Sequence, residues 1–268
     1  MKYIDTHAHL NFEEKYPDFD ELEQKTKSDD VRVINVGTGE ATSQRAVEIA
    51  NGVEHMWAII GLHPIYAAPS YATELGEDFN PEFYQGLLAS SEKIVGVGEC
   101  GFDYFHGNAE GKAKQEREFR AQIEFALKHN LPLMLHIRPS EGSMDAYEDT
   151  LAILATYKSD NQNLRGQAHF FAGTAEIAER FIDLGFYISF TGVITFARMY
   201  EKLVKAIPMD RILSETDCPY VSPHPYRGER NEPSHVREIV RKMAKIKGVE
   251  EEVMAEQIRQ NVKTLYGI

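Results

Sequence analysis

Two histidines near the N-terminus have the residue type and the spacing to chelate a metal ion. His7 and His9 stand at the end of the first apolar run, in the segment Asp5-Thr-His-Ala-His9. Side chains two residues apart in a strand point to the same face of a sheet, so both imidazoles would face one point. One such pair is an ambiguous signal, because it equally fits two polar residues where a strand ends.

Further residues of metal-ligand type each follow a different apolar run. They are Glu99, His136, His169 and Asp217. A lone histidine at a strand end is usually structural, but ligand types at the ends of several strands are hard to explain by chance. In a parallel barrel the C-terminal ends of the strands converge on the rim that carries the active site. The combined pattern therefore predicts a metal centre.

The donor set also indicates how many ions to expect. Three or four nitrogen and oxygen ligands suit Zn²⁺, Mn²⁺, Mg²⁺ or a similar ion and leave a coordination position open for water. The candidates exceed what one catalytic ion needs, so we expect two divalent ions with one bridging carboxylate. Glu99 is the candidate bridge, because it comes from the middle of the strand order. Hydrolysis by an activated water is the chemistry that such a site supports.

Short β-branched runs alternate with longer helical segments along the chain. The expected strands are Tyr3–His7, Val31–Val36, Met56–Gly61, Ile94–Glu99, Leu133–His136, Gly166–Phe170, Tyr187–Phe190 and Arg211–Glu215. The expected helices between them include Ala41–Asn51, Lys112–Asn130, Thr174–Leu184 and Met199–Ile207. This alternation is typical of βαβ units and a parallel sheet. It predicts an α/β fold, a TIM-type (β/α)8 barrel, with a doubly wound open sheet as the alternative.

We expect a single domain over residues 1–268, because apolar runs recur throughout and no linker divides the chain. The segment Ser234–Ile268 predicts two helices separated by Gly248. Between them and the eighth strand lies Pro219–Pro233, a long loop rich in proline and glycine. Long loops in compact domains are usually functional.

Composition restricts the class of protein. The formal net charge of −13 argues against a protein that coats DNA, but bound cations can reverse the local field at an enzyme site. No apolar run is long enough to span a membrane, and the N-terminus lacks the pattern of a signal peptide. The only cysteines, Cys100 and Cys218, suit a reducing compartment and are expected to be buried packing residues. We therefore expect a cytoplasmic protein.

Several longer motifs extend from one end of the chain to the other. They are Asp5-Thr-His-Ala-His-Leu10, Gly61-Leu-His-Pro64, Gly98-Glu-Cys-Gly-Phe-Asp-Tyr104, Leu184-Gly-Phe-Tyr-Ile-Ser-Phe190, Glu215-Thr-Asp-Cys-Pro-Tyr220, Arg227-Gly-Glu-Arg-Asn-Glu-Pro233 and Asn261-Val-Lys-Thr-Leu-Tyr-Gly267. Together they closely resemble the TatD-like metal-dependent DNase family of the amidohydrolase superfamily. The resemblance implies a barrel that hydrolyses DNA phosphodiester bonds at strand ends.

The resemblance also divides the ligands between two ions. It implies one ion held by the residues that match His7, His9, Glu99 and Asp217, and a second held by those that match Glu99, His136 and His169. Asp217 is the expected general base toward the attacking water, and Glu99 and Asp217 are the expected catalytic residues. Glu215, on the same side of the strand end as Asp217, is expected to orient a ligand.

Two residues are candidates for substrate contact. His63 resembles an active-site position of the family and could bind a phosphate or donate a proton, or it could cap a loop. Arg138 could neutralise a phosphoryl oxygen through its fork of donors, or it could form a surface ion pair. The chain departs from the family pattern beside these positions, where Pro139 and Ser140 follow Arg138 and where Phe170-Phe-Ala172 follows His169. These departures concern substrate contacts and leave the ligands in place.

The remaining candidates carry weaker signals. Arg227 and Arg230 in the long loop fit phosphate contacts or exposed charges equally well. Five histidines lack a comparable position at a strand end and are expected not to be ligands: His55, His106, His129, His224 and His235.

Two other functions compete with a nuclease. Another hydrolase of the superfamily would act on an amide, a lactone or a phosphotriester, but many such relatives use a carboxylated lysine where this chain has Glu99. A barrel that only binds metal would be expected to have lost some ligands, and all six candidates are present here.

Overall fold

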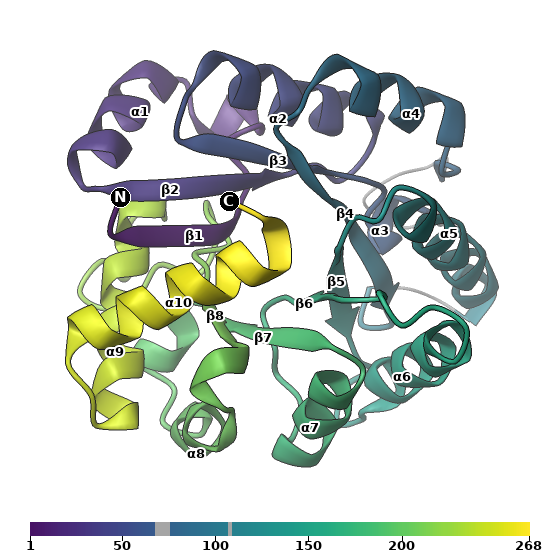
Figure 1. The fold of residues 1–268 in the computed structure, drawn as a ribbon. Helices are drawn as coiled ribbons and strands as arrows, with labels where there is room; N and C mark the ends of the chain where they lie inside the picture. The colour runs from purple at the N-terminus through teal and green to yellow at the C-terminus, as the bar shows by residue number, and fades with distance from the viewer. Residues whose placement is uncertain (68–75, 107–108) are drawn as a thin grey trace.

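The computed structural model describes residues 1–67, 76–106 and 109–268, and its centre is one parallel sheet of eight strands. The strands are β1 (Tyr3–Ala8), β2 (Val31–Val36), β3 (Met56–Ile60), β4 (Ile94–Asp103), β5 (Leu133–Arg138), β6 (Gly166–Ala168), β7 (Phe186–Phe190) and β8 (Ile212–Ser214). They are hydrogen-bonded in the order β1 to β8 and form a ring with helices outside it (Figure 1). The predicted (β/α)8 barrel is confirmed.

Contacts between β8 and β1 close the barrel. The Ser214 hydroxyl donates to the Ile4 carbonyl at 2.9 Å, and the Thr6 hydroxyl donates to the Ser214 carbonyl at 3.0 Å. One step further along, Ala8 forms a parallel bridge with Cys218. A doubly wound sheet would instead reverse its strand order and leave two open edges, so that alternative is wrong.

The helices cover the outside of the ring. They are α1 (Phe19–Ser28), α2 (Glu40–Gly52), α3 (Pro64–Ala67), α4 (Pro81–Ser90), α5 (Ala109–Lys128), α6 (Asp145–Lys158), α7 (Ala175–Asp183), α8 (Tyr200–Ala206), α9 (Val236–Lys247) and α10 (Glu251–Tyr266). The 3-10 turns are η1 (Glu13–Lys15), η2 (Gly192–Thr195), η3 (Met209–Arg211) and η4 (Pro233–His235). Within the described ranges, no helix has the length and apolar character to cross a membrane.

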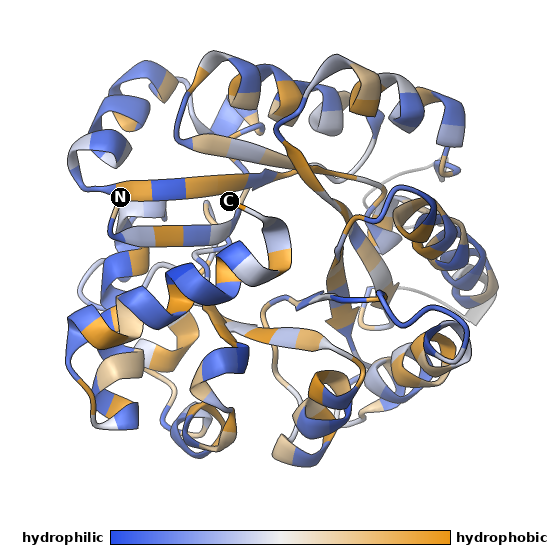
Figure 2. Cartoon of the chain, viewed as in Figure 1, coloured by the Kyte–Doolittle hydropathy of each residue, from blue (hydrophilic) through white to orange (hydrophobic). Residues whose placement is uncertain are grey.

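Hydropathy explains how the helices attach to the ring. The strands are largely apolar, whereas most helices alternate between polar and apolar positions along their length (Figure 2). In α7, for example, Ile177, Ala178 and Phe181 are buried and share one face of the helix. The side chain of Thr174 accepts a hydrogen bond from the Ile177 amide at 3.3 Å and so caps the start of α7. Between α9 and α10, Gly248 takes the left-handed conformation with φ 70°, as the predicted break requires.

The C-terminal helix α10 lies across the end of the barrel at which the strands begin (Figure 1). The Asn261 amide donates to the carbonyls of Met209 and Ile212, at 2.8 Å each, where β8 starts. Near the end of the helix, Tyr266 reaches the barrel interior and donates to Gln167 of β6 at 2.9 Å. This end of the barrel is therefore closed, and the opposite end remains for a site.

Strand β4 differs most from the prediction, which ended it at Glu99. It continues to Asp103, and its register against β5 shifts between Gly98 and Cys100. Glu99 is therefore the extra residue of a β-bulge, a feature that redirects a side chain. Beyond the bulge, Gly101 has φ +134°, and a Cβ there would lie 2.3 Å from the His136 carbonyl oxygen.

We expect Gly101→Ala to destabilise the barrel by on the order of 2–4 kcal/mol, because an added methyl group meets both an unfavourable φ and the β5 backbone. Urea unfolding of chelator-treated protein measures the change. Gly86→Ala is the matched control, because Gly86 lies in α4 with nothing within 4 Å of an added Cβ and should be neutral or slightly stabilising. Equal stabilities for the two variants would contradict this account of β4.

Candidate metal centre

All six predicted ligands come together at the C-terminal end of the barrel. His7 and His136 lie within β1 and β5, and Glu99 lies at the β4 bulge. His9 and His169 follow directly after β1 and β6, and Asp217 is the third residue after β8. Five of them line a cavity of about 720 Å³: His9, Glu99, His136, His169 and Asp217. His7 is fully buried against them. The volume is within the usual range for a small-molecule site.

His7 and His9 face each other, as their spacing predicts. Their Nε2 atoms are 3.1 Å apart. The Nδ1 atom of His9 lies 2.9 Å from the Val36 carbonyl oxygen, which can only accept a hydrogen bond. The proton of the neutral His9 ring is therefore on Nδ1, and its Nε2 lone pair points into the site, where it can bind a cation.

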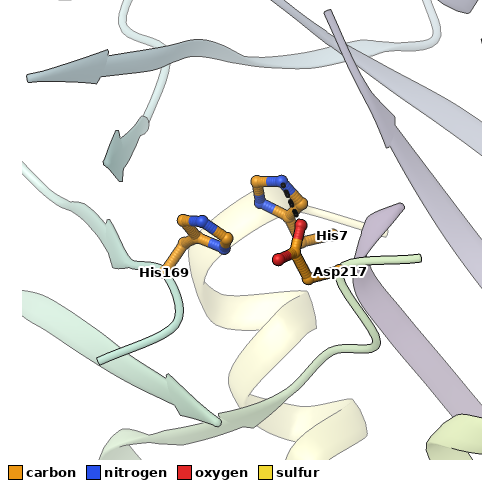
Figure 3. A group of neighbouring side chains, drawn as sticks. All are labelled: His7, His169 and Asp217. Atoms are coloured by element: carbon orange, nitrogen blue, oxygen red, sulfur yellow. Dashed lines mark ion pairs between the residues drawn. The ribbon is translucent and has the colours of Figure 1, made fainter. Parts of the chain in front are cut away.

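Asp217 joins this pair from the loop after β8. Its Oδ1 atom lies 3.8 Å from His7 Nε2 and 3.6 Å from His9 Nε2. Figure 3 shows the carboxylate of Asp217 with the rings of His7 and His169, which stack with their centroids 3.8 Å apart. Burial raises the pKa of Asp217, but the neighbouring rings of His9, His169 and His7, when protonated, outweigh burial and lower it below its ordinary value.

The two carboxylate oxygens of Glu99 face different groups of histidines. Oε2 lies 3.4 Å from His7 Nε2 and 3.7 Å from His9 Nε2. Oε1 lies 2.7 Å from His136 Nδ1 and 3.2 Å from His169 Nε2. A carboxylate placed in this way has the arrangement of a bridge between two cations.

The His136 ring provides a test of whether the site fits a cation. Its Nε2 atom lies 3.1 Å from Asp103 Oδ2, and an ionised carboxylate can only accept, so Nε2 carries a proton. In the neutral ring, Nδ1 would then direct its lone pair at Glu99, 2.7 Å away. That contact is repulsive unless a proton or a metal ion lies there. Burial lowers the pKa of His136, but the hydrogen bonds to Asp103 and Glu99 outweigh burial and raise it. The donor set therefore fits divalent ions.

A buried chain of polar groups in the barrel interior positions His169. Its Nδ1 atom lies 3.2 Å from Glu215 Oε1, an ion-pair contact without the alignment of a hydrogen bond. Gln167 donates to Glu215 Oε2 at 2.8 Å, and Tyr266 donates to Gln167 Oε1 at 2.9 Å. The tyrosine fixes the orientation of the amide, because only the NH₂ group is then left for the carboxylate. Tyr266 of α10 thus supports the candidate ligand His169 through Gln167 and Glu215.

His63 enters the same cavity but differs from the ligands in its protonation. Its Nδ1 atom accepts the Ile65 amide hydrogen at 3.0 Å, so the neutral ring carries its proton on Nε2. That Nε2 atom lies 3.0 Å from His136 Nδ1 and 3.5 Å from Glu99 Oε1. Burial and the charge of His136 lower the pKa of His63 to about 4, which keeps the ring neutral near pH 7. His63 lies close enough to Glu99 and His136 for the three side chains to bind one cation. Its neutral tautomer, however, presents an N–H donor to the site and not a lone pair.

Of the three candidate arginines, only Arg138 lines the cavity. Its guanidinium lies over the ring of Phe105, with Cζ 4.2 Å from the ring centroid. Arg230 is engaged by Asp18 at 2.6 Å, and Arg227 lies over Phe196 at 4.1 Å. The loop arginines thus lie outside the cavity wall.

Sequence reasoning assigned no role to Asp103, Gln167 or Tyr266. Asp103 is four residues after Glu99 and Gln167 is two before His169, so the period of a strand was an available signal for both. Tyr266 comes from a distant helix, and no local pattern points to it. His106 also lines the cavity, with Nδ1 2.9 Å from Asp103 Oδ2, because β4 is longer than predicted.

The remaining predictions concern four histidines and the two cysteines. His55, His129, His224 and His235 are absent from the described cavity lining. Cys100 and Cys218 are fully buried, as predicted.

Comparison with known proteins agrees with this geometry. A sequence profile of the family described as TatD related DNase matches residues 4–267. The chain is 38% identical to the uncharacterized metal-dependent hydrolase YabD of Bacillus subtilis, over 99% of both chains. It is 30% identical to the 3′-5′ ssDNA/RNA exonuclease TatD of Klebsiella pneumoniae, over 94% of this chain and 92% of that protein.

A solved structure gives the same fold. The TatD homolog YjjV of Escherichia coli superposes with a TM-score of 0.85 at 24% identity, over 100% of this chain and 98% of that one. The sequence matches extend over nearly the whole length of the chain, including every strand that carries a candidate ligand. The chain therefore belongs to the TatD-related DNase family and is a metal-dependent hydrolase.

Proposed function

We propose that this protein hydrolyses the phosphodiester bonds of DNA from strand ends, with a water molecule activated by two divalent ions. The observation that carries the proposal is the placement of Glu99: one of its oxygens faces His7 and His9, and the other faces His136 and His169. The names of the family and of the TatD relative, a 3′-5′ ssDNA/RNA exonuclease, support DNA as the substrate.

The ligands divide between two ions along the two oxygens of Glu99. One ion would be held by His7, His9, Glu99 and Asp217, and the other by Glu99, His136 and His169. Mg²⁺, Mn²⁺ and Zn²⁺ all accept such nitrogen and oxygen donors. When bound, two such ions lower the pKa of water, polarise the phosphoryl oxygen and stabilise the charge of the transition state.

Protein side chains supply the remaining steps. Asp217 would take the proton of the attacking water, because its ionised carboxylate lies beside His7 and His9, the rings that would hold one of the ions. His63 offers its Nε2 hydrogen to a phosphate oxygen or to the leaving group, since its Nδ1 atom is already engaged. Arg138 stands on the cavity wall, where its charge can neutralise a phosphoryl oxygen.

Removal of metal should abolish the activity. We expect protein treated with excess chelator to cleave no single-stranded DNA, and added Mn²⁺ or Mg²⁺ to restore cleavage, because no described group replaces the ions as electrophile. Metal content is measured beside the rate. Full turnover by protein shown to be free of metal would contradict the mechanism.

Glu99→Ala should harm catalysis more than His63→Ala. Glu99 would position both ions as their bridge, so its loss should lower metal content as well as kcat/KM. His63 carries its proton on the atom that faces the site, so His63→Ala should keep both ions and lose on the order of 10²–10³-fold in rate. Metal stoichiometry and steady-state kinetics on folded variants test this. Loss of an ion from His63→Ala alone would make His63 a ligand.

Asp217→Asn separates ligation from proton transfer. The amide keeps the shape and one oxygen donor but loses the charge and the basicity. We expect a rate that remains on the order of 10²–10⁴-fold low even when the variant is saturated with metal, the usual contribution of a general base. A metal titration with occupancy measured independently provides the test. Recovery of the parent rate at full occupancy would leave Asp217 as a ligand alone.

A further inference from the structure

A large aromatic side chain, Phe105, is exposed between two residues of the cavity wall, His106 and Arg138, although it is not itself among the described lining residues. The residue follows the end of β4, and 51% of its surface is accessible to solvent. Its ring lies edge-on to His106, with centroids 5.0 Å apart, and His106 lines the cavity. A single exposed aromatic residue is ordinary on a protein surface, so Phe105 is distinguished by its neighbours and not by its exposure.

Arg138 covers one face of that ring. Its Cζ atom lies 4.2 Å from the ring centroid, and the backbone holds the two strand ends together, because the Tyr104 amide donates to the Arg138 carbonyl at 2.8 Å. Throughout the described residues, no carboxylate lies within 4.0 Å of the Arg138 guanidinium. Arg138 is also the sole lysine or arginine among the described residues that line the cavity.

Arg138 and Phe105 together could recognise two parts of a nucleotide, the phosphate and the base. A guanidinium stacked on a ring directs its N–H donors outward in its own plane, where they can grip a phosphate with two parallel hydrogen bonds. An exposed aromatic ring can stack on any base, because every base has a π face. In a duplex the bases are already stacked on one another, so this surface favours a single strand.

We propose that Arg138 and Phe105 form a nucleotide subsite beside the metal centre. Arg138 binds a phosphate of a single-stranded nucleic acid, and Phe105 stacks on the adjoining base without regard to its identity. This inference rests on the proposed function, in that the strand bound here is the one whose bond lies over the metal cavity.

The chain contains a matched control for the pair. Arg227 lies over Phe196 with Cζ 4.1 Å from the ring centroid, and Phe196 is 37% exposed. That pair belongs to the loops after β7 and β8, and Arg227, unlike Arg138, is not among the described residues that line the cavity. Phe196→Leu therefore removes an equivalent ring from outside the proposed subsite.

Binding of a fluorescein-labelled single-stranded DNA with phosphorothioate linkages, measured by anisotropy with Mn²⁺ present, tests the subsite. We expect Phe105→Leu to weaken binding by on the order of 5- to 100-fold, and Phe196→Leu to change it by less than about twofold. Removal of the bases from the three terminal nucleotides should weaken binding to the parent protein by the same factor. It should not weaken binding to Phe105→Leu any further.

Salt dependence separates the two halves of the subsite. Arg138→Gln should reduce the slope of log affinity against log salt by about 0.7, the value for one phosphate contact on a single strand, whereas Phe105→Leu should leave the slope unchanged. Equal losses for Phe105→Leu and Phe196→Leu would overturn the proposal. So would equal binding of intact and base-free DNA by the parent, or no binding of DNA at all.

Hydrolysis of unmodified DNA and of bis(4-nitrophenyl) phosphate by the same proteins distinguishes this inference from the proposed function. A parent protein that binds DNA as expected but hydrolyses neither compound would refute the nuclease function and leave the subsite supported. A parent that hydrolyses the small diester but gives no difference between Phe105→Leu and Phe196→Leu would refute the subsite alone.

Discussion

The rest of this structure depends on one constraint: the buried carboxylate of Glu99 lies close to the imidazole rings of five histidines. Glu99 is 3% exposed, and its oxygens lie between 2.7 and 3.7 Å from the ring nitrogens of five histidines. A buried charge is costly unless positive partners compensate it. Positive charge here comes either from protonated rings or from metal ions, and the architecture gathers ligands from β1, β4, β5, β6 and β8 around that requirement.

In three of these histidines, the partner of one ring nitrogen decides whether the other nitrogen presents a lone pair or a hydrogen to the site. The Val36 carbonyl makes His9 present a lone pair to the site, and Asp103 does the same for His136. His63 receives a backbone N–H instead, and so presents a hydrogen. The five histidines around Glu99 are therefore not equivalent, and the difference between ligand and donor comes from the group that each ring contacts on the side away from Glu99.

The site residues could be predicted from sequence to the extent that they follow strand periodicity. His7 and His9 obey it, and the strand ends bring the other ligands to the same rim of the barrel. The end of β4 could not be predicted in this way, because the bulge at Glu99 and the glycines on either side interrupt the apolar pattern. Contacts between distant elements leave no local signal at all. Tyr266 with Gln167, and Arg138 with Phe105, are pairs of this kind.

The hydrogen bond from α10 to the barrel interior also bears on synthesis of the protein. Gln167 is made about a hundred residues before Tyr266, and β1, made first, is closed only by β8. A nascent chain on the ribosome therefore cannot assemble the supported His169, and it exposes open strand edges until β8 emerges. Contacts so distant in sequence fold slowly, which makes the incomplete barrel the stage most exposed to aggregation and to proteases.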